Sequence, residues 1–206
     1  MKRRFFFFVI LCFFIFSSQI FPYFVEYKEQ YYKLYHIHYE QAPDDIVENI
    51  YWLERAINAD FCNPLHALGK ITTKKEWEKY RYMFMMHLNL KMVEQHLRLG
   101  SKYDKQAAYF YNYPWKEQNI ESLSKAEEFY ETALVYWHEA KLWAEKANMR
   151  EFQFLFLDSL PFWENERARI ASGELNYERT IKRELLRLQK VREDFMNMDD
   201  TTYWFL

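Results

Sequence analysis

Glycine and proline, the residues that most tight turns require, are scarce in this chain: 3 Gly and 5 Pro occur among 206 residues. A protein built from many short strands needs frequent turns, and these two residues supply much of that turn chemistry. Half of the residues are hydrophobic, which is enough for one buried core. The scarcity of turn residues therefore predicts an all-α protein made of a few long helices.

The N-terminal 25 residues have the pattern of a membrane-targeting segment. Basic residues at 2–4 precede a stretch from 5 to 25 that contains no charged residue. As a helix this stretch would span about 31 Å, close to the ~30 Å thickness of the hydrocarbon layer. Its small residues are poorly spaced for signal-peptidase cleavage. We expect residues 1–25 to be a retained signal anchor or a cleaved signal peptide.

The positive-inside rule then places the remaining chain outside the cytoplasm. We expect a periplasmic or other extracytoplasmic protein, anchored to the cytoplasmic membrane through residues 5–25. Without the three N-terminal basic residues, 25 Lys and Arg stand against 30 Asp and Glu, a net charge of −5. Nucleic-acid-binding proteins carry a basic surface, so no nucleic-acid partner is expected.

Apolar residues at helical spacing make residues 26–200 one helical domain. Asp44-Asp45 and Thr72-Thr73 are capping residues before the second and third helices. The third helix is expected to bend or end at Gly100. The helices predicted from periodicity cover residues 24–40, 46–57, 74–99, 122 or 124 to 147, 151–160, 164–171 and 174–196, the last two after a break at Pro161.

Two aromatic segments interrupt or follow these helices. Residues 109–115, Tyr-Phe-Tyr-Asn-Tyr-Pro-Trp, contain too many rings for a featureless linker, so we expect an ordered, packed loop. Residues 201–206 form an aromatic C-terminal tail, in which the apolar residues 203–206 follow a polar break at 199–202. Cys62 is the single cysteine of the body, so no disulfide is expected within it.

Three short motifs resemble parts of a tetratricopeptide repeat, which is a pair of packed helices. They are Ala126-x3-Tyr130-x2-Ala133-Leu134, Leu99-Gly100-x2-Tyr103, and Leu53-x2-Ala56-Ile57 followed by Leu68-Gly69. The chain departs from the repeat pattern because no Pro ends the repeat after Ala133 and residues are inserted between the motifs. The resemblance implies antiparallel helical hairpins in a degenerate repeat body, a fold that binds proteins or peptides on concave surfaces.

The stretch at 58–105 is also similar to exported spirochaete proteins associated with the periplasmic flagellar motor. The similarity lies in Asn-Ala-Asp-Phe-Cys-Asn-Pro-Leu-His-Ala-Leu-Gly-Lys at its start and Leu-Gly-Ser-Lys-Tyr-Asp-Lys at its end. This resemblance implies a structural component of the collar around the motor. It implies no particular functional residue.

Aromatic residues make up 21% of the chain, more than one core of this size needs. Tyr32, Tyr35 and Tyr39 form a stripe on the first predicted helix, because residues three and four apart share a helix face. Tyr is favoured at protein interfaces. We therefore expect partner binding at this stripe and at Tyr203, Trp204 and Phe205 of the tail. Packing of the stripe on the second helix and docking of the tail on its own chain are the alternatives.

No catalytic, cofactor-binding or metal-binding residue is predicted. His36 and His38 point to different sides of a helix, and the methionines around His87 are ordinary core residues. Nucleotide-binding, zinc-protease and hydrolase motifs are absent from the sequence. We expect an exported, membrane-tethered helical-repeat adaptor that acts in protein–protein assembly. The alternative is an exported binding protein with an aromatic-lined pocket for an apolar or glycan ligand.

Overall fold

The computed structural model describes residues 24–199, and over these residues the protein is all-helical, which confirms the predicted fold class. Within that range no strand is present. The six α-helices are α2 (Lys28–Gln41), α3 (Ile46–Asn58), α4 (Lys74–Tyr103), α5 (Lys116–Ala147), α6 (Pro161–Ala171) and α7 (Tyr177–Met196). The three 3₁₀ helices are η1 (Pro64–His66), η2 (Phe110–Trp115) and η3 (Arg150–Phe152).

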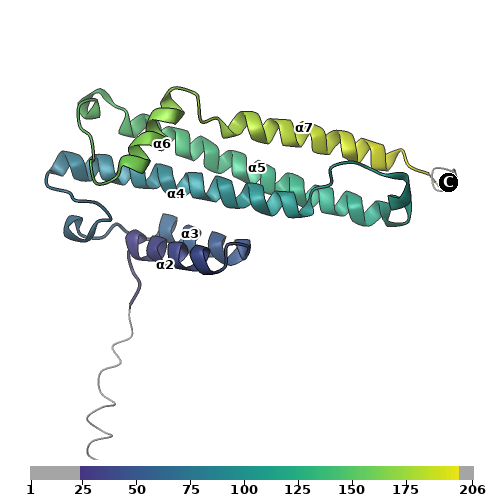
Figure 1. Ribbon diagram of the computed structural model, residues 1–206, viewed down its shortest axis with the longest axis horizontal. Helices are drawn as coiled ribbons and strands as arrows, with labels where there is room; N and C mark the ends of the chain where they lie inside the picture. Colours follow the sequence, from purple (N-terminus) through teal and green to yellow (C-terminus); the bar gives the residue numbers. More distant parts are fainter. Residues whose placement is uncertain (1–23, 200–206) are drawn as a thin grey trace, which may run out of the picture.

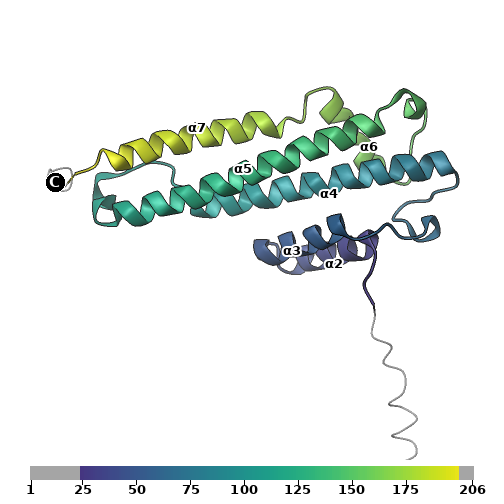
Figure 2. The same cartoon turned by 180° about the vertical axis from the view of Figure 1, so that it is seen from behind.

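The two long helices α4 and α5 form the axis of the molecule and run side by side in opposite directions (Figure 1). α7 packs along α5, and the short pair α2 and α3 packs against the opposite side of α4. α6 crosses the first half of α4. In Figure 1, α2 lies below α4 and α6 crosses in front of α4 and α5; Figure 2 shows the same arrangement from behind.

Small residues allow α4 and α5 to approach closely. Ala126, Ala133 and Ala140 recur every seven residues on α5 and are fully buried. Gly100 of α4 faces the ring of Tyr130, and a Cβ at Gly100 would lie only 2.5 Å from a ring carbon. α4 continues through Gly100 and ends at Tyr103. Of the two predicted outcomes at Gly100, a bend or an end, the end is therefore wrong.

The core has two parts that meet along α4. One part lies between α4, α5 and α7 and includes Trp137, Leu188 and Phe195. The other lies between α2, α3, α4 and α6 and is rich in aromatic rings, with Tyr80 and Phe84 fully buried at its centre. This second part brings rings from four helices together, and it builds the floor of the cleft described below.

Side-chain caps start α3 and α4 at the predicted residues. The Asp45 carboxylate accepts a hydrogen bond from the backbone N–H of Glu48 at 3.2 Å. The Thr73 hydroxyl accepts one from the N–H of Glu76 at 3.1 Å, and the Glu76 carboxylate accepts one in return from the N–H of Thr73 at 3.0 Å. This reciprocal pair is a capping box, whose partners lie three residues apart and are visible in the sequence.

The predicted start of α5 is wrong. The helix begins at Lys116, directly after η2, and Ser122 and Ser124 lie inside it. Ser122 donates its hydroxyl hydrogen to the carbonyl of Tyr103 at 2.6 Å, so it ties α5 to the end of α4 and does not cap a helix. The 109–115 segment is ordered, as expected, but it forms η2 and leaves its large rings partly exposed to solvent.

The predicted helix at 151–160 is also wrong. Apart from η3, this segment is irregular because side chains of other helices bind its backbone. The Lys79 ammonium donates to the carbonyl of Leu155, and the backbone N–H of Leu157 donates to Glu164 at 3.1 Å. Pro161 occupies the first turn of α6, where a missing N–H costs nothing, so a helix begins there.

Most of the predicted membrane-targeting segment, residues 1–25, lies outside the described residues, and the tail at 201–206 lies wholly outside them. Between residues 24 and 199, no helix combines the length and hydrophobicity needed to cross a bilayer. The anchor and the tail therefore stay predictions.

Candidate functional site

α2, α4 and α6, with residues just before α4 and α6, enclose a cleft that we call the aromatic cleft. It consists of two adjoining hollows of about 480 and 280 Å³, which share Tyr32, His36 and Trp163 as lining residues. Cavities of a few hundred Å³ are typical of small-ligand sites. The larger hollow is also lined by Lys33, Ile37, Leu68 and Leu160, and the smaller one by Tyr35, Tyr39, His87, Lys91, Glu94 and Phe162.

The three tyrosines predicted from the stripe on α2 all line this cleft, but they differ in exposure. Tyr35 is 4% exposed, so its ring belongs to the core. Tyr32 is partly buried, and its ring packs edge-on against Phe84 of α4. Tyr39 is 37% exposed, and Arg98 lies over its ring at 5.6 Å. The stripe thus packs mainly on α4, and Tyr32 and Tyr39 remain accessible from the cleft.

A chain of three hydrogen-bonded polar groups, two of them buried, forms the floor of the cleft. The Tyr32 hydroxyl lies 2.8 Å from Nε2 of His87, and Nδ1 of the same ring lies 2.7 Å from a carboxylate oxygen of Glu166. Burial, aided by the negative charges of Glu166 and Glu94, raises the pKa of Tyr32, so its phenol stays protonated. Since a carboxylate can only accept, Nδ1 carries a hydrogen, and in the neutral form of the ring Nε2 accepts from the Tyr32 hydroxyl.

This arrangement fixes what Tyr32 offers to a ligand. When His87 is neutral, the hydrogen of Tyr32 is used by His87, and the phenol oxygen keeps lone pairs that can accept a hydrogen bond. His87 is held between the ring of Trp163, stacked at 5.1 Å, and the ring of Phe162, which meets it edge-on at 6.1 Å. Aromatic rings therefore hold the His87 ring on two sides, in addition to its two hydrogen bonds.

Most charged groups at the cleft are paired, and Lys33 is the exception among its lining residues. The Lys91 ammonium lies 2.8 Å from the Glu94 carboxylate on the same helix, and the Glu166 carboxylate binds His87. Lys33 and His36 stand on the exposed side. The cleft thus presents aromatic walls and hydrogen-bonding groups without a strong net charge.

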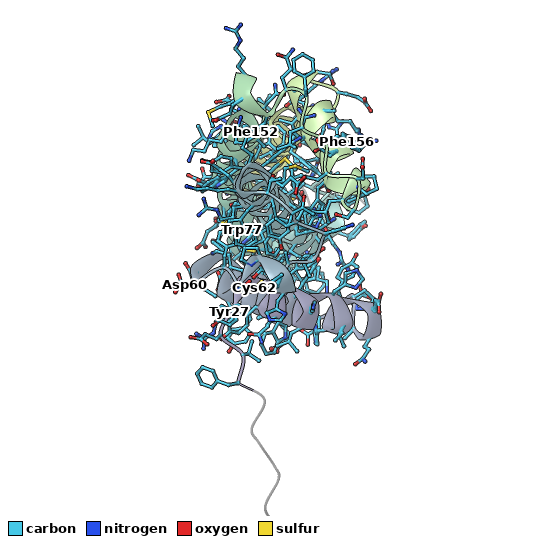
Figure 3. All side chains as sticks on the ribbon, turned by 90° about the vertical axis from the view of Figure 1, so that its left-hand side faces the viewer. Tyr27, Asp60, Cys62, Trp77, Phe152 and Phe156 are labelled. Carbon is cyan, nitrogen blue, oxygen red and sulfur yellow. The ribbon has the colours of Figure 1, made fainter. Side chains whose placement is uncertain are left out.

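Two exposed aromatic surfaces lie at opposite ends of the α4–α5 pair. The first, the 154–156 surface, lies in the connection between α5 and α6, where Phe154 is 95% exposed and Phe156 is 56% exposed. Figure 3 looks at this end of the molecule, where Trp77 marks the beginning of α4 and Phe156 stands at the edge. Lys79 and Glu164 form an ion pair that is almost completely buried beneath this connection and holds its backbone.

The second exposed aromatic surface, the 109–115 surface, lies in the connection that joins the end of α4 to the start of α5. Tyr109 and Tyr111 stack at 5.4 Å, and the Phe110 ring meets Tyr111 edge-on at 5.4 Å. These rings and Trp115 are 41–58% exposed. Arg187 of α7 anchors the start of this connection by donating to the carbonyl of Lys105 at 2.7 Å.

Sequence reasoning found the α2 stripe but missed its partners in the cleft. His87 lies 55 residues from Tyr32, and Glu166 lies 79 residues from His87. Neither has a motif that would single it out. Phe162 lay beside a predicted break, so its exposed ring was not anticipated. The tail residues Tyr203, Trp204 and Phe205 lie outside the described range.

In the part of the chain that the structure describes, no three His, Cys, Asp or Glu side chains are grouped to hold a metal ion. His36 lies beside Glu40 at 3.2 Å, and His38 lies 3.0 Å from the side-chain oxygen of Asn49. The two histidines thus have separate neighbours on separate sides of α2. Cys62 is a buried free thiol.

A family model described as a domain of unknown function, DUF8513, matches residues 75–198. The matched range covers more than half of the chain and runs from the first turn of α4 to the end of α7. It contains both exposed aromatic surfaces and the α4 and α6 sides of the cleft, and it leaves out α2 and α3. No curated protein and no solved structure is significantly similar to this chain.

Proposed function

Since this chain belongs to the DUF8513 family of domains of unknown function, we propose its role from its own geometry: an exported, membrane-tethered helical adaptor in protein–protein assembly. The observation that carries the proposal is the exposure of aromatic side chains at both ends of the α4–α5 pair. An adaptor binds two partners at the same time, which requires two separate binding surfaces. Two surfaces at opposite ends of one helix pair meet that requirement.

The exposed rings favour binding because of their energetics. Burying a side chain the size of Phe stabilises a protein or a complex by about 1.5–3 kcal/mol. Phe154 faces water, so the folded chain alone does not gain this free energy. A partner that covers several such rings recovers this free energy. Aromatic side chains with few rotatable bonds also lose little conformational entropy on binding.

Side chains of other helices anchor the backbone of both connections. The buried pair of Lys79 and Glu164 fixes the 154–156 surface, and Arg187 anchors the connection that carries the 109–115 surface. A surface that is already in its binding conformation spends less free energy on ordering when it binds.

The resemblances support a structural role. The tetratricopeptide-like motifs suggest a degenerate repeat body with helical hairpins, and such bodies recognise proteins. The similarity to exported spirochaete proteins suggests the collar of the periplasmic flagellar motor as the assembly. Residues 5–25 would supply the tether to the membrane, with the helical body in the periplasm.

Variants at the two surfaces test the proposal. One variant carries Phe154→Ser and Phe156→Ser, and the other carries Phe110→Ser and Tyr111→Ser. A matched control is Leu186→Ser, which removes an apolar side chain that is 69% exposed on α7. Each protein is crosslinked mildly in its native cells and purified, and the recovered proteins are quantified by mass spectrometry.

We expect each surface variant to lose at least one protein that wild type recovers in stoichiometric amounts, while the control recovers all of them. The thermal melting temperatures of the variants should equal that of wild type, because the replaced rings are exposed. The adaptor proposal fails when both surface variants recover the same proteins as wild type, or when wild type recovers none.

A further inference from the structure

The larger hollow of the aromatic cleft combines an apolar wall with one unpaired cation, a combination that the adaptor proposal does not use. We infer that this hollow binds a single-chain amphiphile with one negative charge on its head, such as a fatty acid. The hollow of about 480 Å³ is lined from α2, α6 and the segments that precede α4 and α6. It shares no lining residue with either exposed aromatic surface, so the site is separate from the proposed partner contacts.

Four side chains form the apolar wall of the hollow: Ile37 of α2, Leu68 before α4, Leu160 before α6, and Trp163 of α6. Ile37 is 53% exposed, so more than half of this apolar side chain faces water in the folded protein. Trp163 is only 5% exposed and stacks on Phe84 at 5.1 Å, which holds its ring in the wall. An acyl chain laid against these residues removes apolar surface of both molecules from water, which favours binding.

Contacts between two distant segments build this wall. The backbone N–H of Lys70 donates to the Ser159 hydroxyl oxygen at 2.9 Å, so the residues before α4 lie against the residues before α6. Gly69 permits this close approach, because a Cβ there would lie only 2.8 Å from a side-chain carbon of Leu160. These contacts bring Leu68 and Leu160 to the same hollow.

Lys33 supplies the positive charge. Its exposed side chain lines the larger hollow and has no ion-pair partner between residues 24 and 199. His36 lines the same hollow, but its Nδ1 lies 3.2 Å from a carboxylate oxygen of Glu40. A negatively charged head at this hollow therefore meets an ammonium that no carboxylate already holds. One ammonium matches a head with one negative charge.

The charged groups of the smaller hollow are already engaged. One carboxylate oxygen of Glu94 lies 2.8 Å from the Lys91 ammonium, and the other accepts from the Tyr177 hydroxyl at 3.4 Å. An anionic head finds no unpaired cation there. The head therefore lies at Lys33, and the acyl chain lies on the apolar wall of the larger hollow.

Other ligand classes fit this hollow less well. A cationic amphiphile would be repelled by Lys33, and a neutral apolar molecule would leave its ammonium without a partner. An extended peptide pairs with the edge of a sheet, and the described residues contain no strand. A fatty acid matches both the apolar wall and the cation.

Photolabelling of the full-length protein in nanodiscs of phosphatidylcholine tests the inference at pH 8, where a fatty acid is ionised. The probe is a fatty acid that carries a photoreactive diazirine in its chain, and mass spectrometry identifies the labelled peptides. Laurate and dodecyltrimethylammonium compete with the probe. They carry chains of about the same length and differ in the sign of the head charge.

Two variants change the hollow. Lys33→Glu reverses its charge, and the matched control is Lys190→Glu, a reversal at an exposed lysine of α7. Ile37→Ser removes an apolar side chain of the wall, and the matched control is Leu186→Ser, at a residue of α7 that is 69% exposed. All four positions are exposed, so the variants should fold, and thermal melting of each verifies this.

We expect wild type and both controls to be labelled in the peptides that carry Ile37, Leu68 and Leu160. Laurate should displace the probe about tenfold more effectively than dodecyltrimethylammonium, because an attractive and a repulsive pair of exposed charges each change the affinity by about threefold. Lys33→Glu should invert this order, which is a gain of affinity for the cation that misfolding cannot produce. Ile37→Ser should weaken the binding of laurate by about fivefold.

The inference is overturned if excess laurate does not reduce the labelling of these peptides, or if the two amphiphiles compete equally in wild type. It is also overturned if folded Lys33→Glu keeps the wild-type order or folded Ile37→Ser keeps the wild-type affinity. Labelling that falls as the protein concentration rises would show that a second copy covers the cleft, which also overturns it. None of these results bears on the adaptor proposal, which depends on the 154–156 and 109–115 surfaces, so the two proposals fail separately.

Discussion

Acid should destabilise this protein through one buried histidine. His96 on α4 is 7% exposed and stacks on the ring of Tyr136 at 5.4 Å. Neither of its ring nitrogens has a hydrogen-bond partner within the described residues. Burial lowers the pKa of His96 from 6.5 to about 4, because no neighbouring group compensates for the lost hydration of the imidazolium.

The sign of the effect follows from this lowered pKa. The folded protein binds the proton more weakly than the unfolded chain, so the stabilisation is complete above pH 6.5 and is lost as the pH falls toward 4. Each tenfold difference in proton affinity is worth about 1.4 kcal/mol. The total loss is therefore about 3 kcal/mol, of which about 2 kcal/mol should already be lost at pH 5.

The His96→Leu variant tests this effect. Urea unfolding followed by tryptophan fluorescence gives the free energy of unfolding of wild type and variant at pH 8 and pH 5. We expect wild type to lose about 2 kcal/mol more than the variant over this range. Other titrating groups are present in both proteins and cancel in the comparison. The control is His66→Leu, since His66 is exposed in η1.

The control should keep the pH dependence of wild type. If His96→Leu loses as much free energy of unfolding as wild type between pH 8 and pH 5, burial does not depress the proton affinity of His96 and the reasoning is refuted. A higher stability of the variant at pH 8 alone would not decide the question, because leucine also removes two unpartnered nitrogens.

Three further predictions concern buried residues. Gly100→Ala should lower the free energy of unfolding by about 1–3 kcal/mol in thermal melts, although alanine normally stabilises a helix, because its Cβ would press on the Tyr130 ring; an unchanged or higher melting temperature would contradict this. Lys79→Met should cost about 1.5–3 kcal/mol in urea unfolding, because the buried Glu164 carboxylate keeps Arg167 but loses the ammonium, and the Leu155 carbonyl loses its donor; a loss below 1 kcal/mol would contradict this. Burial raises the pKa of Cys62 to about 12, so peptide mapping should show iodoacetamide labelling at pH 8 at least about a hundredfold slower in the folded than in the urea-unfolded protein.

Local patterns were sufficient to predict much of the secondary structure. The caps at Asp45 and Thr73 lie within three residues of the N–H groups that they bind, so they appear directly in the sequence. The errors arose where distant contacts override local preference. Residues 151–160 have helical composition, but Lys79 binds the Leu155 carbonyl from 76 residues away.

The candidate sites show the same division. The stripe of Tyr32, Tyr35 and Tyr39 could be predicted because helical spacing brings these residues to one face. The exposure of each ring could not be predicted, because it depends on where α4 and α6 pack. The arrangement of the described helices does not decide whether the repeat-like motifs form repeats. The degenerate repeat body stays a prediction.

The sequence by itself determined that the chain is helical, because Gly and Pro scarcity, apolar periodicity and capping act over a few residues. The tertiary structure alone decided which side chains meet. The hydrogen bonds from Tyr32 to His87 and from His87 to Glu166 join residues 55 and 79 positions apart. The packing of α2 and α6 against α4 creates these bonds, and that packing results from the whole core, so no local pattern contains it.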